Sequence, residues 1–350
     1  MVCQDMFLNY MKVLNQSMLL IFLSIAVLLK TVYFCIIYEM LRAGDIMKIK
    51  KIALIGMGAV GTVYGRLLYN FFGDDFKVIA DGSRKERLQE SGFTLNNETF
   101  YPNVISEGNS KETFDLIIFC VKNYQLEEAI EDVKSFVGEN TVLITFLNGV
   151  TARDRIHKAF PNNKTLYGLA MRIDAERTNN GFINTEDGEI HFGEADNTVI
   201  SPEVKAVQEC FNEAGIKNIV FPDMIRMIWK KFMLNVGVNQ VTAVTRSPYG
   251  KVTHLETNLV LFKEAMNEVL KIAKASQIDL REEDIDDFVT LMNSFSPMGR
   301  TSMLQDVEAK RRTEVDYFAG TVIEMGKKLN IPTPVNYVLY NIIKSVEQLY

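Results

Sequence analysis

The sequence predicts an α/β N-terminal domain followed by an all-helical C-terminal domain. From Lys48 onward, short apolar runs alternate with amphipathic stretches, a pattern typical of α/β units. A glycine-rich turn at 56–61 joins the first apolar run to the first amphipathic one. After about Pro222 the strand-like runs end, and long helical periodicities continue to the C-terminus. We therefore expect an α/β domain over 47–221 and a helical domain over 222–350.

The elements of the α/β domain follow from the apolar runs and the turns between them. Strands are expected at 49–55, 76–80, 116–121, 141–146, 166–173, 181–184, 189–193 and 218–221. Helices are expected over 62–72 and 201–214, and the helical domain opens with one long, mostly apolar helix over 224–244. A cleft between the two domains is the expected ligand site.

The glycine turn carries the first functional motif, Gly56-x-Gly58-x-x-Gly61. Between a strand and a helix, Gly56 permits a tight turn, Gly58 lets the backbone approach a diphosphate, and Gly61 lets the helix pack against the strand. Free N–H groups and the helix dipole favour an anion at this point. We therefore predict a Rossmann-type site for a nicotinamide dinucleotide, with contacts from Gly56, Met57, Gly58, Ala59, Val60 and Gly61.

The end of the second predicted strand bears on the choice between NAD and NADP. An acid there binds the ribose 2′-hydroxyl of NAD, whereas a nearby arginine favours the 2′-phosphate of NADP. Asp81 gives the first signal, and Ser83, Arg84 and Lys85 give the second. A hydroxyl and two cations can hold a phosphate, although cations at a helix start can also be simply solvated. We predict NADP(H), held by Ser83 and Arg84.

Length, composition and charge narrow the class of protein. The 350 residues are 47% hydrophobic and 23% charged, which suits a globular chain of two domains. The net charge is −6 and no long basic run is present, so no nucleic-acid partner is expected. Four scattered cysteines and three histidines without metal-ligand spacing predict reduced thiols and no metal site.

Residues 1–46 form an extension of a different character. The stretch 18–29 is apolar, Lys30 interrupts it, and 31–38 is apolar again, so that together they are long enough to cross a bilayer. However, the sequence MKIKKIALIGMGAVG from Met47 is how a cytosolic dinucleotide-binding protein normally starts. We favour an over-extended reading frame and a cytoplasmic protein. A membrane anchor is the alternative, so a membrane is a partner only if the extension is genuine.

Two polar pairs directly follow predicted strands. Lys122-Asn123 ends the strand at 116–121, and Asn148-Gly149 ends the strand at 141–146. Each pair alone would be an ordinary turn. Open α/β sheets bind ligands at the carboxyl ends of their strands, however. We therefore expect Lys122 and Asn148 to contact the cofactor or the substrate.

The long helix carries three polar residues on one face. Lys231, Asn235 and Asn239 are spaced i, i+4, i+8, while the remainder of the helix is nearly apolar and should be buried. Buried polar groups need partners because leaving them unpaired is costly. The stripe is therefore either part of a ligand site, which we favour, or a polar seam against other groups of the protein.

A second set of polar residues lies farther along the chain. Ser302 and Asp306 share a helical face, but in one straight helix Glu314 would lie about 18 Å from Ser302. A small ligand can therefore touch both only if the helix breaks. Thr313 as N-cap and Asp316 three residues later predict such a break, with Glu314 in the first turn of a new helix. The alternative is an ordinary solvated glutamate.

In their order along the chain, the motifs GMGAVG, FLNGV, WKKFMLNVGVN, SMLQD and TEVDY resemble those of ketopantoate reductases, from about Met47 to Asn336. The resemblance implies a Rossmann-type domain, a helical domain and NADPH-dependent reduction of 2-dehydropantoate to pantoate, a step towards coenzyme A. It also implies that Lys231 and Glu314 are catalytic and that Lys122 lies on the cofactor side. The substrate contacts that it implies are Asn148, Asn235, Asn239 and Ser302.

Some positions depart from the family pattern and bear on the exact substrate. Ala319 stands where many members have asparagine, and Gly299 stands where some have a polar contact. One alternative is therefore a related NAD(P)-dependent reductase of another branched 2-oxoacid. A non-catalytic NADP(H)-binding regulator is a further alternative, which the full polar set argues against. The expected partner is a small 2-oxoacid, and pairing into a homodimer is left open.

Overall fold

The computed structural model describes Met6, Lys30, Tyr33, Phe34, 47–107 and 112–350. The chain divides into two compact units, Met1–Met47 and Lys48–Tyr350. Apart from the four isolated positions, the predicted extension 1–46 lies outside the described residues. Within the part of the chain that is described, no helix is long and apolar enough to cross a membrane. The origin of the extension and the location of the protein stay predictions.

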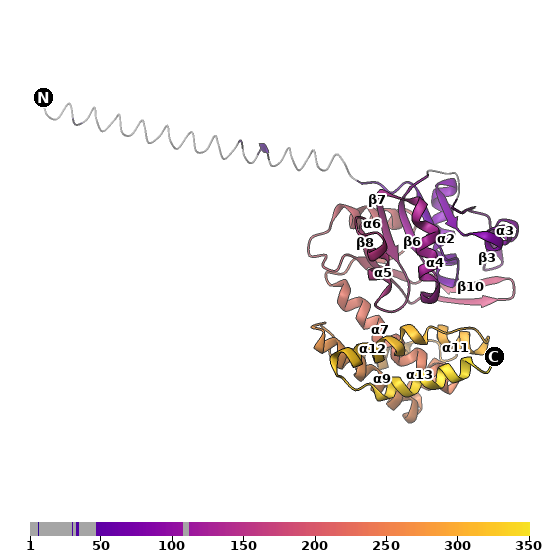
Figure 1. Cartoon of the computed structure of the whole chain (residues 1–350), viewed down its shortest axis with the longest axis vertical. Coiled ribbons are helices and arrows are strands. Elements are labelled where there is room, and N and C mark those ends of the chain that lie inside the picture. Colours follow the sequence, from indigo (N-terminus) through magenta and orange to yellow (C-terminus); the bar gives the residue numbers. More distant parts are fainter. Residues whose placement is uncertain (1–5, 7–29, 31–32, 35–46, 108–111) are drawn as a thin grey trace. The chain divides into compact units, whose positions relative to one another are not determined.

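An eight-stranded sheet forms the first part of the second unit (Figure 1). Its order is β12-β11-β8-β7-β6-β1-β2-β5, and every neighbouring pair is parallel except β11 with β8. Parallel strands are covered on both faces, which explains why the predicted strands are continuous apolar runs. The strands are β1 (Ile52–Ile55), β2 (Phe76–Ile79), β5 (Asn103–Ile105), β6 (Phe114–Phe119), β7 (Val137–Thr145), β8 (Thr165–Met171), β11 (Glu189–Gly193) and β12 (Asn218–Ile219).

Helices follow the strands as expected for an α/β domain. They are α2 (Ala59–Phe72), α3 (Gly82–Ser91), α4 (Leu126–Val133), α5 (Ala152–Ala159) and α6 (Pro202–Glu213). The predicted start of α2 at residue 62 is wrong by three residues. Gly58 is extended and serves as the N-cap, so the helix begins at the next residue, inside the glycine motif. The first-turn N–H groups of α2 are therefore supplied by the motif itself.

A second, four-stranded sheet was not predicted. It has the order β4-β3-β10-β9 and consists of β3 (Phe93–Leu95), β4 (Glu98–Phe100), β9 (Asp174–Thr178) and β10 (Gly181–Glu186). Only part of β10 has a recognisable strand pattern. The strand β9 has the sequence DAERT and is mostly exposed, so it lacks the apolar residues that identify a buried strand.

The remainder of the chain is helical, as predicted. Its helices are α7 (Met224–Thr245), α8 (Tyr249–His254), α9 (Glu256–Ala275), α10 (Glu283–Ser294), α11 (Ser302–Glu308), α12 (Ala319–Leu329) and α13 (Pro334–Glu347). The helix α7 packs against α9, α11 and α13. At Gly237 a Cβ would lie 2.7 Å from a ring carbon of Phe262, so glycine permits the close approach of α7 to α9. The expected α/β domain with a helical C-terminal domain is confirmed.

Candidate functional site

The glycine turn has the geometry that a bound diphosphate requires. Gly56 has φ of +101°, and a Cβ at Gly61 would lie 2.1 Å from the carbonyl oxygen of Gly56. Neither position therefore accepts a side chain without movement of the backbone. At Gly58 a Cβ would meet no atom within 4 Å, so the space before the N-terminus of α2 is open. These residues fit the diphosphate of a dinucleotide, which would accept hydrogen bonds from the first-turn N–H groups.

The end of β2 carries the groups that are expected from the sequence to lie near the 2′ position of the ribose. Asp81 is the N-cap of α3, and its carboxylate accepts a hydrogen bond of 2.7 Å from the Gly82 N–H. Lys85 donates to the Ser106 hydroxyl at 2.9 Å. In the described part of the chain, the Arg84 side chain makes no hydrogen bond or ion pair. Arg84 and the neighbouring Ser83 thus remain free to hold a phosphate, beside a carboxylate that is already engaged.

Glu314 lies at the centre of a cluster that joins the two parts of the fold. Its Oε2 lies 3.2 Å from the Lys122 ammonium and accepts a hydrogen bond of 3.4 Å from the Asn148 amide. Its Oε1 accepts from the backbone N–H and the amide of Asn123, at 3.2 and 3.0 Å. Lys122 also pairs with Asp306 at 3.0 Å. Residues that are 192 positions apart therefore share one ionic site.

The charges of this cluster keep one another ionised. Burial by itself would raise the pKa of Glu314, but the Lys122 charge and the Asn123 hydrogen bonds outweigh it and hold the pKa below its ordinary value. Burial would likewise lower the pKa of Lys122, yet the charges of Glu314 and Asp306 raise it. Glu314 is therefore a carboxylate and Lys122 an ammonium across the neutral range.

A ladder of amides leads from this cluster along α7. The Asn235 amide donates to the Asn148 side-chain oxygen at 3.5 Å, and the Asn239 amide donates to the Asn235 side-chain oxygen at 3.2 Å. The Asn239 oxygen in turn accepts from the Ser302 hydroxyl at 3.3 Å and from the Met303 N–H at 3.2 Å. The predicted residues Glu314, Asn148, Asn235, Asn239 and Ser302 thus form one continuous chain of hydrogen bonds.

Lys231 lies one helical turn before Asn235 on the same face of α7. Its ammonium donates a hydrogen bond of 2.7 Å to the Ala170 carbonyl at the end of β8. Among the described residues, no carboxylate lies within salt-bridge distance of it. Loss of hydration lowers the pKa of Lys231 to about 8, while the charge of Glu314 acts in the opposite direction. The Lys231 ammonium is therefore more acidic than an ordinary lysine and can readily donate a proton.

The segment after α11 differs from the sequence prediction in two details. The chain does break after α11, and the Thr313 hydroxyl accepts a hydrogen bond of 3.2 Å from the Val315 N–H, but the segment that follows is not a regular α-helix. Glu314 itself precedes a short 3-10 segment, Val315–Tyr317, and makes no side-chain capping bond. The Asp316 carboxylate accepts from the Tyr340 hydroxyl at 2.8 Å and pairs with Lys344, both on α13, so it does not form the expected capping box.

Two members of the cluster were not assigned a role from the sequence. From the sequence, Asn123 is only the neighbour of Lys122, and Asp306 only shares a helical face with Ser302. Both are buried, and both contact Lys122 or Glu314 directly. Lys122, which is expected to contact the cofactor, also forms ion pairs with Asp306 and Glu314 of the helical part. The available signal was adjacency to Lys122 for Asn123, and a helical face shared with Ser302 for Asp306.

Comparisons with known proteins place the chain in a family. The family model described as ketopantoate reductase PanE/ApbA matches residues 52–197, and its C-terminal counterpart matches residues 223–347. A 2-dehydropantoate 2-reductase of Pyrococcus horikoshii is 28% identical over 315 residues, which cover 85% of this chain and 98% of the relative. An uncharacterized oxidoreductase of Bacillus subtilis, YkpB, is 28% identical over 296 residues, covering 83% and 96%.

Solved structures share the fold. A D-mandelate dehydrogenase with NADH and anilino(oxo)acetate matches with a TM-score of 0.76 and 23% identity, covering 85% of this chain and 98% of the other. A dimeric ketopantoate reductase from Staphylococcus aureus matches with a TM-score of 0.72 and 21% identity, covering 85% and 99%. The chain therefore belongs to the ketopantoate reductase PanE/ApbA family of oxidoreductases, which bind a nicotinamide dinucleotide.

Proposed function

We propose that this protein is an NADPH-dependent 2-dehydropantoate 2-reductase that forms pantoate for pantothenate and coenzyme A synthesis. The observation that carries the proposal is the continuous polar network from Glu314 to Ser302, with the ammonium of Lys231, which donates to the Ala170 carbonyl, beside it. Relatives named as 2-dehydropantoate 2-reductases support it. The network also argues against a non-catalytic regulator, because binding the dinucleotide alone does not need Asn235, Asn239 and Ser302.

Each residue has a separate task in the proposed reaction. NADPH supplies the hydride when it is bound at the glycine turn. Lys231 stabilises the charge that develops on the keto oxygen and donates the proton. Asn235 and Asn239 orient the hydroxyl of the substrate, and Ser302 holds its carboxylate. Glu314 positions Asn148 and supplies the negative charge that favours the protonated form of Lys231.

The direct test is NADPH oxidation by the purified protein with ketopantoate and a panel of other branched 2-oxoacids. The proposal expects ketopantoate to have a kcat/KM at least as high as that of any other compound of the panel. A clear preference for a different branched 2-oxoacid would replace ketopantoate as the substrate while keeping the reaction. Absence of turnover with every compound and both nicotinamides would overturn the reductase proposal.

The pH dependence of kcat/KM provides a first prediction. The proton donor is present while Lys231 is protonated, below its pKa of about 8, and is lost as the pH rises above that value. Because kcat/KM reports the ionisation of the free enzyme, reduction should decline as the pH increases through about 8. Initial rates at low substrate concentration between neutral and alkaline pH measure this. A profile that stays flat up to the ordinary pKa of lysine would contradict the assignment.

Cofactor preference provides a second prediction, since a free Arg84 near the ribose favours NADPH. Arg84→Ala should lower kcat/KM for NADPH by about 10–100-fold, the effect of losing a charged hydrogen bond worth about 1.5–3 kcal/mol. The value for NADH should change little. Lys85→Ala is the matched control, because Lys85 is held by Ser106. Equal use of NADH and NADPH by the unaltered protein would show that Asp81 governs the site instead.

Assembly into a homodimer is part of the proposal. A dimeric ketopantoate reductase among the structural neighbours supports it.

A further inference from the structure

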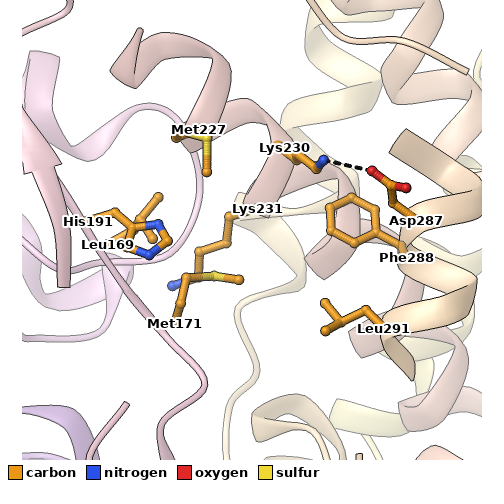
Figure 2. A pocket seen from close by; sticks show the side chains of 9 residues that line it. All are labelled: Leu169, Met171, His191, Met227, Lys230, Lys231, Asp287, Phe288 and Leu291. Carbon is orange, nitrogen blue, oxygen red and sulfur yellow. Dashed lines mark hydrogen bonds and ion pairs between the residues drawn. The ribbon is translucent and has the colours of Figure 1, made fainter. Parts of the chain in front are cut away.

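A pocket of about 230 Å³ lies beside Lys231, with strands β8 and β11 on one side and helices α7 and α10 on the other (Figure 2). Most of its lining is apolar, but His191 of β11 and Lys231 of α7 both contribute to it. Figure 2 shows the Lys231 side chain extending towards the side on which His191 lies, whereas Lys230 turns away to its ion pair with Asp287. His191 has no role in the proposed reaction, yet it shares this small space with the proton donor.

His191 is held in one orientation by its neighbours. Only 5% of its surface is exposed, its Nε2 lies 2.9 Å from a Glu189 carboxylate oxygen, and its ring packs against Phe221 with 4.8 Å between the ring centres. Because a carboxylate only accepts hydrogen bonds, Nε2 carries the proton of the neutral ring and Nδ1 is left as an acceptor. Among the described residues, this buried Nδ1 has no hydrogen-bond partner. It therefore lacks a donor, and a buried acceptor without one is destabilising.

The Lys231 ammonium has more donors than acceptors around it. A lysine ammonium carries three N–H groups, and in the described part of the chain the Ala170 carbonyl accepts from one of them, at 2.7 Å. The proposed reaction uses a second N–H for the keto oxygen of the substrate. The third needs an acceptor in a place where burial has removed much of the hydration. A donor without an acceptor and an acceptor without a donor thus belong to residues that line one pocket.

The charges around His191 keep its ring neutral near neutral pH. Burial holds the pKa of His191 below its ordinary value, and the positive charges of Lys231 and Arg172 act in the same direction, against the Glu189 carboxylate. The other two charged groups of the lining pair with each other. His191 therefore offers Lys231 a lone pair and not a second positive charge.

We propose that His191 is a positioning residue for Lys231, and that its Nδ1 accepts a hydrogen bond from the ammonium through one water bound in the pocket. Such a water has a donor on one side and an acceptor on the other, and the pocket far exceeds the about 10–15 Å³ that one water needs. With two N–H groups fixed by this water and by the Ala170 carbonyl, the third points in one direction, to the substrate. The inference rests on the proposed reductase activity, in which Lys231 donates the proton.

Protonation of His191 should remove this support. The imidazolium carries a proton on Nδ1, so it no longer accepts a hydrogen bond and it repels the ammonium. Because the pKa of His191 is lowered, kcat/KM should decline as the pH falls below about 6.5, the ordinary value for histidine, in addition to its decline above about 8. Initial rates at low substrate concentration on the acid side of neutrality measure this decline.

Two replacements separate the acceptor from the packing of the ring. His191→Phe keeps an aromatic ring against Phe221 but has no acceptor, so kcat/KM should fall about tenfold. Its alkaline decline should also move to lower pH, because the charged form of Lys231 loses a hydrogen bond. His191→Asn offers an amide oxygen near the position of Nδ1 and does not titrate, so it should recover most of the kcat/KM that His191→Phe loses and show no acid decline.

His157→Phe is the matched control. His157 on α5 also has a buried Nδ1 without a partner among the described residues, but it does not line the pocket. The same substitution there should leave both declines of kcat/KM in place. If His191→Phe keeps the kcat/KM and both declines of the unaltered protein, or if His157→Phe alters the pH profile as much as His191→Phe does, the proposal is wrong.

Nuclear magnetic resonance of nitrogen-labelled histidine needs no turnover and separates this inference from the proposed function. It reports which ring nitrogen of His191 carries the proton and how the ring titrates. We expect the Nε2-protonated form at neutral pH, and a higher pKa of His191 in Lys231→Met but not in Lys230→Met, because Lys231 is the α7 lysine whose charge lowers this pKa. If no 2-oxoacid is reduced but this pattern holds, the reductase proposal fails and the contact between His191 and Lys231 stands. If Lys231→Met leaves the pKa of His191 unchanged, the contact does not exist.

Discussion

Lys231→Ala is expected to lower kcat by about 10²–10⁴-fold, the usual effect of losing a general acid. The alanine removes both the proton donor and the positive charge next to the developing oxyanion. NADPH affinity should change little, because the glycine turn and Arg84 lie in the α/β domain. Folding should be retained, since removing a partly buried cation also removes the cost of its desolvation. Steady-state kinetics, NADPH titration and thermal unfolding of the variant measure the three effects.

Lys230 is the internal control for this prediction. It is the adjacent residue on α7, about 100° around the helix, and its ammonium pairs with Asp284 and Asp287 on α10. Lys230→Ala should therefore lower stability while keeping most of kcat with a small 2-oxoacid. Loss of turnover in Lys230→Ala together with normal turnover in Lys231→Ala would show that the helical phase is assigned wrongly. If neither variant affects kcat, the proton donor is another group.

The features that the sequence predicted are those that depend on local spacing. The glycine turn follows from three residues between a strand and a helix. The stripe of Lys231, Asn235 and Asn239 follows from helical geometry alone. Both are present in the structure because a short motif keeps its conformation wherever its element packs. The fold class was predictable for the same reason, since apolar runs and helical periodicity are read along the chain.

The features that the sequence did not predict depend on contacts between distant residues. The ion pair of Lys122 with Glu314 joins positions 192 residues apart, and nothing near either residue indicates the other. The small sheet was missed because β9 is polar, and its pairing with β10 is set by the turn between them. The pocket beside Lys231 draws on β8, β11, α7 and α10, so it exists only in the folded chain.

Glu314→Gln is expected to move the alkaline decline of kcat/KM to lower pH, and to lower kcat/KM above pH 8 by about tenfold for each unit by which the pKa of Lys231 falls. The charge of Glu314 raises the pKa of Lys231, so removing that charge should lower this pKa below its value of about 8. Less of the proton donor is then present at any given pH. The glutamine still offers an oxygen to Asn123, but its NH2 group cannot accept the hydrogen bonds that Glu314 Oε2 accepts from Lys122 and Asn148. A pH profile of kcat/KM for the variant and the unaltered protein measures the shift.

Two further variants separate electrostatic tuning of Lys231 from a general loss of stability. Glu314→Ala leaves the buried backbone N–H of Asn123 without an acceptor, and the Asn123 amide keeps only its hydrogen bond to the Asn148 carbonyl. An unsatisfied buried group costs about 1–3 kcal/mol, so this variant should unfold at a lower temperature than Glu314→Gln. Asp306→Asn removes the other carboxylate bound to Lys122, but Asp306 does not contribute to the pKa shift of Lys231. Asp306→Asn should therefore reduce stability and leave the alkaline decline of kcat/KM at the same pH. If Asp306→Asn shifts the alkaline decline of kcat/KM as far as Glu314→Gln does, Glu314 acts by holding the cluster together and not through the effect of its charge on the pKa of Lys231.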